Sequence, residues 1–169
     1  MAASASAAKL VVEREHAILR CRAAVEACRD EGILLLARTD ARVSRGFDEA
    51  LARIRAFVAE GADILFLDSP QSEEEMRTGI EACDGKPALA VTSPAGKHFM
   101  AGDAELERIG IRIVVYPQDI LAASVRAMRD ALAGLKGGSK PPMASPAELA
   151  TAIRIAEYLS QDSRWPDPS

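Results

Sequence analysis

Charged side chains stand where short apolar runs end in this chain, and these residues are the best suited to chemistry. Arg38 follows the run Ile33–Ala37, and Asp68 follows the run Ile64–Leu67. A guanidinium can hold a carboxylate through two parallel hydrogen bonds, so Arg38 is a candidate clamp for an anionic substrate. The alternative is that Arg38 pairs with Asp40 or Asp68 and only connects two loops. The residues alone leave both interpretations open.

Asp68 has two interpretations of its own. Its carboxylate could hold water around a divalent cation, or it could fix the position of Arg38. The alternative is a cap at the start of the next helix, a role that Ser69 or Ser72 could share. Neither interpretation makes Asp68 a direct metal ligand, and the residues indicate no catalytic acid, base or nucleophile.

Ser93 lies in the loop after a third apolar run, near Gly96, Lys97 and His98. Any of these side chains could contact an anionic substrate, which makes Ser93 a third candidate for substrate binding. A loop with this composition is nevertheless common in proteins of many functions. His98, like His16, is more typical of a surface residue than of a metal ligand or a catalytic base.

The elements that must position these residues form a repeated pattern of a short apolar run, a polar loop and a segment with helical spacing. The predicted strands are Ile33–Ala37, Ile64–Leu67, Ala88–Val91 and Ile111–Tyr116, with the first buried on both faces. The predicted helices are Val12–Arg29, Asp48–Glu60, a helix from Ser72, a helix near Asp103–Ile109, and Asp119–Leu135. Strands separated by helices must pair in parallel, so the sequence predicts an α/β fold of about four βα units. The candidate residues then share the edge where strands end.

Eight such units close a (β/α)₈ barrel of the TIM type, so four units predict a partial barrel. Residues 1–8 are expected to form a disordered tail and residues 9–136 the half-barrel. A linker rich in glycine and proline follows at 137–145, then a terminal helix at 146–160, with Pro146–Leu159 as its main part, and a polar tail at 161–169. The apolar side chains of the terminal helix need a surface to cover them, on this subunit or on a neighbour.

Composition excludes several classes of function. The net charge of −4 argues against nucleic acid as a partner, because phosphate binding needs a concentrated basic surface. No apolar run approaches the roughly 20 residues that span a bilayer, and the opening MAASASAA lacks the features of a signal peptide. Cys21, Cys28 and Cys83 are interpreted as reduced, buried thiols. We expect a cytoplasmic protein, with an organelle as the alternative.

Three segments carry a resemblance to a known family. They are LLLARTDARVSRGFDEALARIRAFVAEGADILFLDSP, GKPALAV and IGIRIVVYPQDILAASVRAMRDALAGLKGG. They resemble the phosphoenolpyruvate mutase/isocitrate lyase superfamily, in particular its branch of carboxyvinyl-carboxyphosphonate phosphorylmutase and petal death protein. The similarity begins near Lys9, and the ARTDA motif is its most specific part.

The resemblance implies a (β/α)₈ barrel with a terminal helix exchanged between subunits, of which this chain matches the last four units. It implies a Mg²⁺-dependent lyase or mutase that acts on C–C or P–C bonds of small 2-oxo or 2-hydroxy acids, such as methylisocitrate, dimethylmalate or oxaloacetate. Mg²⁺ would neutralise the enolate that forms beside a carbonyl. By resemblance, Arg38 binds the substrate carboxylate, Asp68 contacts substrate or the waters of the metal, and Ser93 contacts substrate.

The departures from the family pattern concern the metal and the catalytic cysteine. The metal-binding aspartates and the cysteine-bearing mobile loop belong to the half that this sequence does not match, and Val91 stands where many members have Asn. We therefore expect the chain to be inactive alone. The alternatives are a non-catalytic protein that associates with a full-length homologue, a homo-oligomer, and a truncated product without a role of its own, which should dimerise or aggregate.

Overall fold

The computed structural model describes residues 10–92 and 102–162 of the 169-residue chain. The chain divides into two compact units, Met1–Ile120 and Leu121–Ser169, and each is described by itself. Ser93, together with Gly96, Lys97 and His98, lies outside the described residues. No helix in the described part of the chain is long and apolar enough to cross a membrane.

The first unit alternates strands and helices, as expected. Its elements are α1 (Arg14–Arg29), β1 (Leu36–Thr39), α2 (Ala41–Arg45), α3 (Phe47–Glu60), β2 (Ile64–Leu67), α4 (Glu73–Glu81), β3 (Leu89–Val91), α5 (Asp103–Ile109) and β4 (Ile113–Val115). Strand β1 pairs with β2, and β3 pairs with β4, both in parallel. A parallel bridge between Leu65 and Ala88 joins the two pairs. The predicted α/β class with parallel strands is confirmed.

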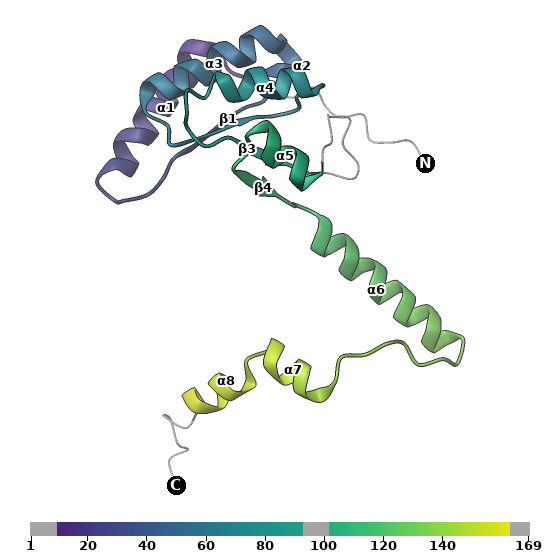
Figure 1. Cartoon of the computed structure of the whole chain (residues 1–169). Helices are drawn as coiled ribbons and strands as arrows, with labels where there is room; N and C mark the ends of the chain where they lie inside the picture. Colours follow the sequence, from purple (N-terminus) through teal and green to yellow (C-terminus); the bar gives the residue numbers. More distant parts are fainter. Residues whose placement is uncertain (1–9, 93–101, 163–169) are drawn as a thin grey trace. The chain divides into compact units, whose positions relative to one another are not determined.

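The core of this unit lies between the strands and helix α3, which runs with α1 and α4 along one side of β1 in Figure 1. Ile54 of α3 and Leu65 of β2 are the largest fully buried side chains. Helix α3 ends where predicted, at Gly61, whose φ of 102° is in the left-handed region that favours glycine. The chain reaches β2 three residues after Gly61, so this glycine fixes where α3 ends and how short the connection to β2 is.

Strand β1 differs from the prediction in position and in burial. It covers Leu36–Thr39, so Arg38 lies inside the strand instead of after it. Ile33 and Leu34, predicted to be buried in the strand, are 60% and 69% exposed. Side chains alternate along β1, and only Ala37 and Thr39 are buried. In the described part of the chain β2 is the single strand that pairs with β1, so the other edge of β1 has no strand beside it.

Other predicted boundaries need smaller corrections. Strand β3 begins at Leu89, strand β4 covers only Ile113–Val115, and the short helix α2 was not predicted. Helices α1, α4 and α5 agree with the sequence pattern, and Ser72 caps α4 by accepting a hydrogen bond from the backbone of Glu75.

The second unit consists of helices. Helix α6 (Asp119–Lys136) leads into it, and α7 (Pro146–Ala152) and α8 (Ile155–Asp162) follow the segment 137–145. The prediction of one continuous terminal helix was wrong, because Arg154 adopts a φ of 53° and separates α7 from α8. Ser145 and Glu148 form a capping box at the start of α7, which fixes that boundary.

Candidate functional site

Arg38 is surrounded by two carboxylates at the end of β1. Its Nε and Nη2 donate to the two carboxylate oxygens of Asp40 at 2.9 and 2.7 Å. Nη2 also lies 3.2 Å from Oδ1 of Asp68, at the end of β2. The Arg38 side chain is 42% exposed, so the guanidinium is accessible from solvent. The structure therefore shows the pairing of Arg38 with Asp40 and Asp68 that the alternative interpretation named, and it leaves substrate binding by Arg38 a prediction.

The sheet register explains this arrangement. Arg38 pairs with Phe66 across β1 and β2, and side chains at paired positions point to the same face of a sheet. The guanidinium carbon lies 4.8 Å from the centroid of the Phe66 ring, a cation–π distance. The hydrogen bond with Asp40 raises the pKa of Arg38, burial opposes the rise, and the charge of Asp68 adds to it. Arg38 is therefore a permanently charged and oriented donor.

Asp68 is nearly buried, at 9% exposure. Its Oδ2 accepts a hydrogen bond of 2.8 Å from the hydroxyl of Ser69. Ser72, one of the residues that the helix-cap interpretation named, caps the following helix α4. Its carboxylate thus contacts Arg38 and Ser69 at the strand ends.

A cavity of about 120 Å³ lies next to these strand ends. Asp68, Ser69 and Glu75 contribute polar groups to its wall, and the remaining wall is mostly apolar. Val91 of β3 also lines this cavity. Arg38 and Asp40 do not line this cavity; they line a more open groove of about 370 Å³ between α1 and β1.

A Mg²⁺ site does not fit the residues that the structure describes. In residues 10–92 and 102–162 there is no group of three or more acidic, histidine or cysteine side chains that could hold a metal. Asp40 and Asp68 could each offer an oxygen, but both carboxylates contact the guanidinium of Arg38. Mg²⁺ is often held by only one or two carboxylates together with water, but a cation between Asp40 and Asp68 would lie beside the positive charge of Arg38, which repels it.

The two buried cysteines are poor candidates for a nucleophile. Cys21 and Cys83 are buried, as predicted, whereas Cys28 is partly exposed. Burial raises the pKa of Cys83 to about 11, and burial also raises the pKa of Cys21. Because the thiolate is the reactive form, both buried thiols are inert at neutral pH.

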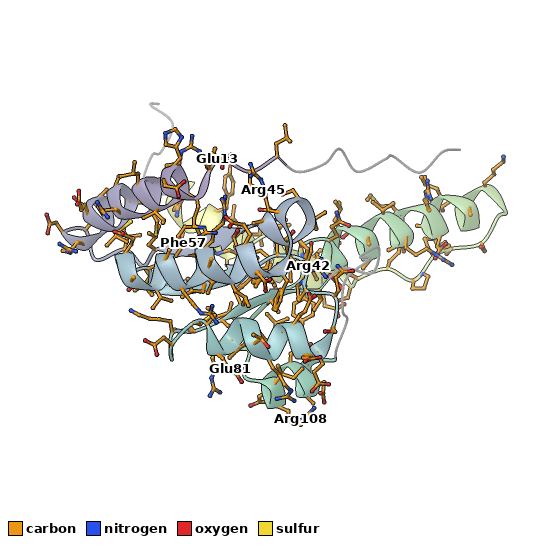
Figure 2. The ribbon with its side chains drawn as sticks, turned by 90° about the horizontal axis from the view of Figure 1, so that it is seen from above. Glu13, Arg42, Arg45, Phe57, Glu81 and Arg108 are labelled. Atoms are coloured by element: carbon orange, nitrogen blue, oxygen red, sulfur yellow. The ribbon has the colours of Figure 1, made fainter. Side chains whose placement is uncertain are left out.

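An ion pair that sequence reasoning missed joins Arg42 of α2 and Glu75 of α4. Nε and Nη2 of Arg42 donate to Glu75 at 2.9 and 2.7 Å. Arg42, labelled in Figure 2, belongs to α2, whereas Arg45 of the same helix lies beside Glu13 and donates to it at 2.7 Å. The sequence shows that the first turn of α4 is acidic, but Arg42, the partner of Glu75, precedes it by 33 residues.

Comparison with known proteins places the chain in a family. Residues 2–136 match the family described as phosphoenolpyruvate phosphomutase. The chain is 37% identical to 2,3-dimethylmalate lyase of Eubacterium barkeri over 126 residues, which are 75% of this chain and 43% of that protein. It is 29% identical over 165 residues to the chloroplastic carboxyvinyl-carboxyphosphonate phosphorylmutase of Arabidopsis thaliana, covering 93% of this chain and 48% of the relative. The chain spans about half the length of these curated relatives.

Solved structures agree with this assignment. The crystal structure of 2,3-dimethylmalate lyase, a PEP mutase/isocitrate lyase superfamily member, matches 95% of this chain and 58% of its own, with a TM-score of 0.79 and 32% identity. A phosphonopyruvate hydrolase solved with oxalate and Mg²⁺ shares the fold, with a TM-score of 0.75 and 20% identity over 96% of this chain and 60% of its own. The resemblance seen in the sequence is confirmed, and the chain belongs to the phosphoenolpyruvate phosphomutase family of the PEP mutase/isocitrate lyase superfamily.

Proposed function

We propose that this chain supplies the carboxylate-binding part of a lyase or mutase that acts on C–C or P–C bonds of small 2-oxo or 2-hydroxy acids. The observation that carries the proposal is the guanidinium of Arg38 at the strand end, oriented by Asp40 and Asp68. A relative 37% identical to this chain is a 2,3-dimethylmalate lyase, which supports this substrate class. Dimethylmalate, methylisocitrate and oxaloacetate are the substrates to test first.

In this proposal Arg38 binds and orients one substrate carboxylate. Cleavage beside a carbonyl leaves negative charge on an enolate oxygen, so the reacting bond must be held where that charge can be stabilised. Asp68 keeps the guanidinium in place, and Ser93 contacts substrate from the third strand-end loop. The described residues do not supply a complete Mg²⁺ site, so catalysis requires ligands from elsewhere, and we expect the 169-residue chain alone to be inactive.

The proposed architecture is about half of a (β/α)₈ barrel. The parallel pairs β1–β2 and β3–β4 and the bridge between Leu65 and Ala88 support it, because they place the four strands in consecutive order. In such a barrel the carboxyl ends of the strands form the active-site face. Arg38 and Asp68 lie at these ends.

The proposal is tested by binding and by activity. Isothermal titration calorimetry with oxalate, a small dicarboxylate, should detect binding to the wild-type chain and its loss in Arg38→Ala. Cleavage of 2,3-dimethylmalate, 2-methylisocitrate and oxaloacetate with Mg²⁺ is then measured for the chain alone and mixed with a full-length homologue. Oxalate binding that does not depend on Arg38 would contradict the proposed role.

A second candidate function is association without catalysis. Ile33 and Leu34, just before β1, and Leu36 within it expose apolar surface, and one edge of β1 has no described strand beside it. A groove of about 370 Å³ runs between α1 and β1, lined in part by Leu10 and Leu36. Exposed strand edges and apolar surface favour association, here with a second copy or with a full-length homologue.

Sedimentation of the chain, alone and with the homologue, tests this second candidate. Association that weakens in Leu34→Glu, but not in Val43→Glu on the exposed face of α2, would support it. A monodisperse monomer that unfolds cooperatively and never co-purifies with a homologue would count against it. Cell fractionation would test the proposed cytoplasmic location against an organelle.

A further inference from the structure

The loop after β2 holds Asp68 by means of an unfavourable backbone conformation. Ser69 has a φ of 63°, in the left-handed region that non-glycine residues rarely adopt. The same serine is only 4% exposed and donates its hydroxyl to Asp68 at 2.8 Å. Because this conformation is costly for a serine, the surrounding structure must hold it in place.

Gln71 provides part of that support. Its side-chain amide donates to the carbonyl of Ser69 at 3.1 Å. Its backbone N–H donates to Oε2 of Glu75 at 2.8 Å. The loop that carries Ser69 is therefore attached to the first turn of α4 through one carboxylate, that of Glu75.

Glu75 also connects this loop to helix α2, which follows β1. Its two oxygens accept from Nε and Nη2 of Arg42 at 2.9 and 2.7 Å, in a bidentate pair. The side chains are 25% and 19% exposed, so the pair is partly shielded from water. The bond from Arg42 lowers the pKa of Glu75, burial opposes this, and the Gln71 backbone lowers it further. Arg42 lies four residues after Arg38, so Glu75 joins the two strand ends that form the site.

We infer that Glu75 is a positioning residue for the carboxylate site: it accepts from Arg42 and from the backbone of Gln71, and so holds the loop that places Asp68 against Arg38. This inference rests on the proposed function, because it assigns Glu75 to the site built around Arg38. Glu75 does not have to touch the substrate. Its effect passes through Gln71, Ser69 and Asp68 to the guanidinium.

The test compares Glu75→Ala with Glu73→Ala in the full 169-residue chain. Glu73 is a matched control, since it lies in the same helical turn and pairs with Arg77 at 2.5 Å and Arg108 at 3.1 Å, away from the loop. We expect Glu75→Ala to raise the dissociation constant of oxalate about tenfold, while its melting temperature stays close to that of Glu73→Ala. Glu75→Gln keeps an acceptor for Gln71 and should recover part of the affinity.

Amide hydrogen exchange gives a second readout that needs no ligand. The N–H groups of Asp68 and Gln71 donate to Thr39 and Glu75, and both should exchange faster in Glu75→Ala than in Glu73→Ala. If Arg38→Ala loses oxalate and Glu75→Ala binds it like wild type, the inference is overturned and the proposed function stands. If the wild-type chain binds no oxalate, the proposed function is overturned, and unchanged exchange at Asp68 and Gln71 would overturn the inference as well.

Discussion

The two units of this chain differ in how far their helices bury apolar side chains. In the first unit, α3 buries Leu51, Ile54 and Phe57 against the strands. In the second unit, Leu121 and Leu132 of α6 are 64% and 68% exposed, although helix α6 is strongly amphipathic in sequence. An amphipathic pattern thus predicts a helix in both units, but only in the first are its apolar side chains buried within the same unit. Because most helical stability comes from packing, the second unit should depend on a surface that covers these side chains.

Truncating a core side chain of the first unit should lower stability far more than truncating an exposed side chain of α6. Ile54→Ala removes a fully buried side chain and leaves a cavity, so we expect a loss of about 3–4 kcal/mol in the free energy of unfolding. Leu132→Ala, at an exposed position of α6, is the matched control and should change stability little in the monomer. Urea denaturation of both variants measures the difference. Equal losses would mean that α6 is also packed in solution.

Arg53 tests whether buried polar contacts also stabilise the first unit. Its side chain is 3% exposed, pairs with Glu49 at 2.8 Å and donates to the carbonyl of Val12 at 2.6 Å. Arg53→Met keeps much of the volume but removes these bonds, so we expect a loss of about 2 kcal/mol. Chemical denaturation measures it. Full stability in this variant would show that α3 does not need Arg53 to hold the segment before α1.

Acid should weaken the first unit through Glu49. Hydrogen bonding from Arg14 is the largest cause that lowers the pKa of Glu49 from 4.5 to about 2, burial opposes it, and Arg53 adds a further bond. A carboxylate with a lowered folded-state pKa contributes stability above its unfolded pKa and loses it as pH falls through the folded value. The melting temperature should therefore fall between about pH 4.5 and 2. Glu49→Gln should flatten this part of the profile, whereas an unchanged slope would contradict the assignment.

The smallest effect is expected for an exposed ion pair of α6. Arg126 and Asp130 have the same i,i+4 spacing as Glu49 and Arg53, but their side chains are 79% and 61% exposed. Solvent screens such a pair almost completely, so Arg126→Ala should leave the denaturation midpoint unchanged. A clear shift would indicate that α6 is covered in solution and would weaken the contrast between the units.

Local patterns predicted the elements that local residues determine. Helix α3 with its glycine stop and strand β2 agree with the sequence within one residue, because their apolar spacing and turn residues are contiguous. Strand β1 was misplaced, since the apolarity of Ile33 and Leu34 indicated burial that the pairing with β2 does not provide. The break at Arg154 had no sequence signal, because neither glycine nor proline marks it.

At the candidate site, the sequence predicted the ion pairs around Arg38 but not the bond between Arg42 and Glu75. Arg38, Asp40 and Asp68 were predicted as possible partners, and the structure brings them together. The bond between Arg42 and Glu75 could not be predicted, because it depends on how two successive βα units pack. Ser93 stays a prediction, since it lies outside the described residues.

The long separation between Arg42 and Glu75 also has a consequence for folding kinetics. These residues are 33 positions apart, so their bond closes a loop that contains α3 and β2. Loop-closure entropy disfavours such contacts until the intervening elements have condensed, so the pair should form late on the folding pathway. A chain that has collapsed but not yet docked α4 would contain every residue of the carboxylate site and still be unable to bind.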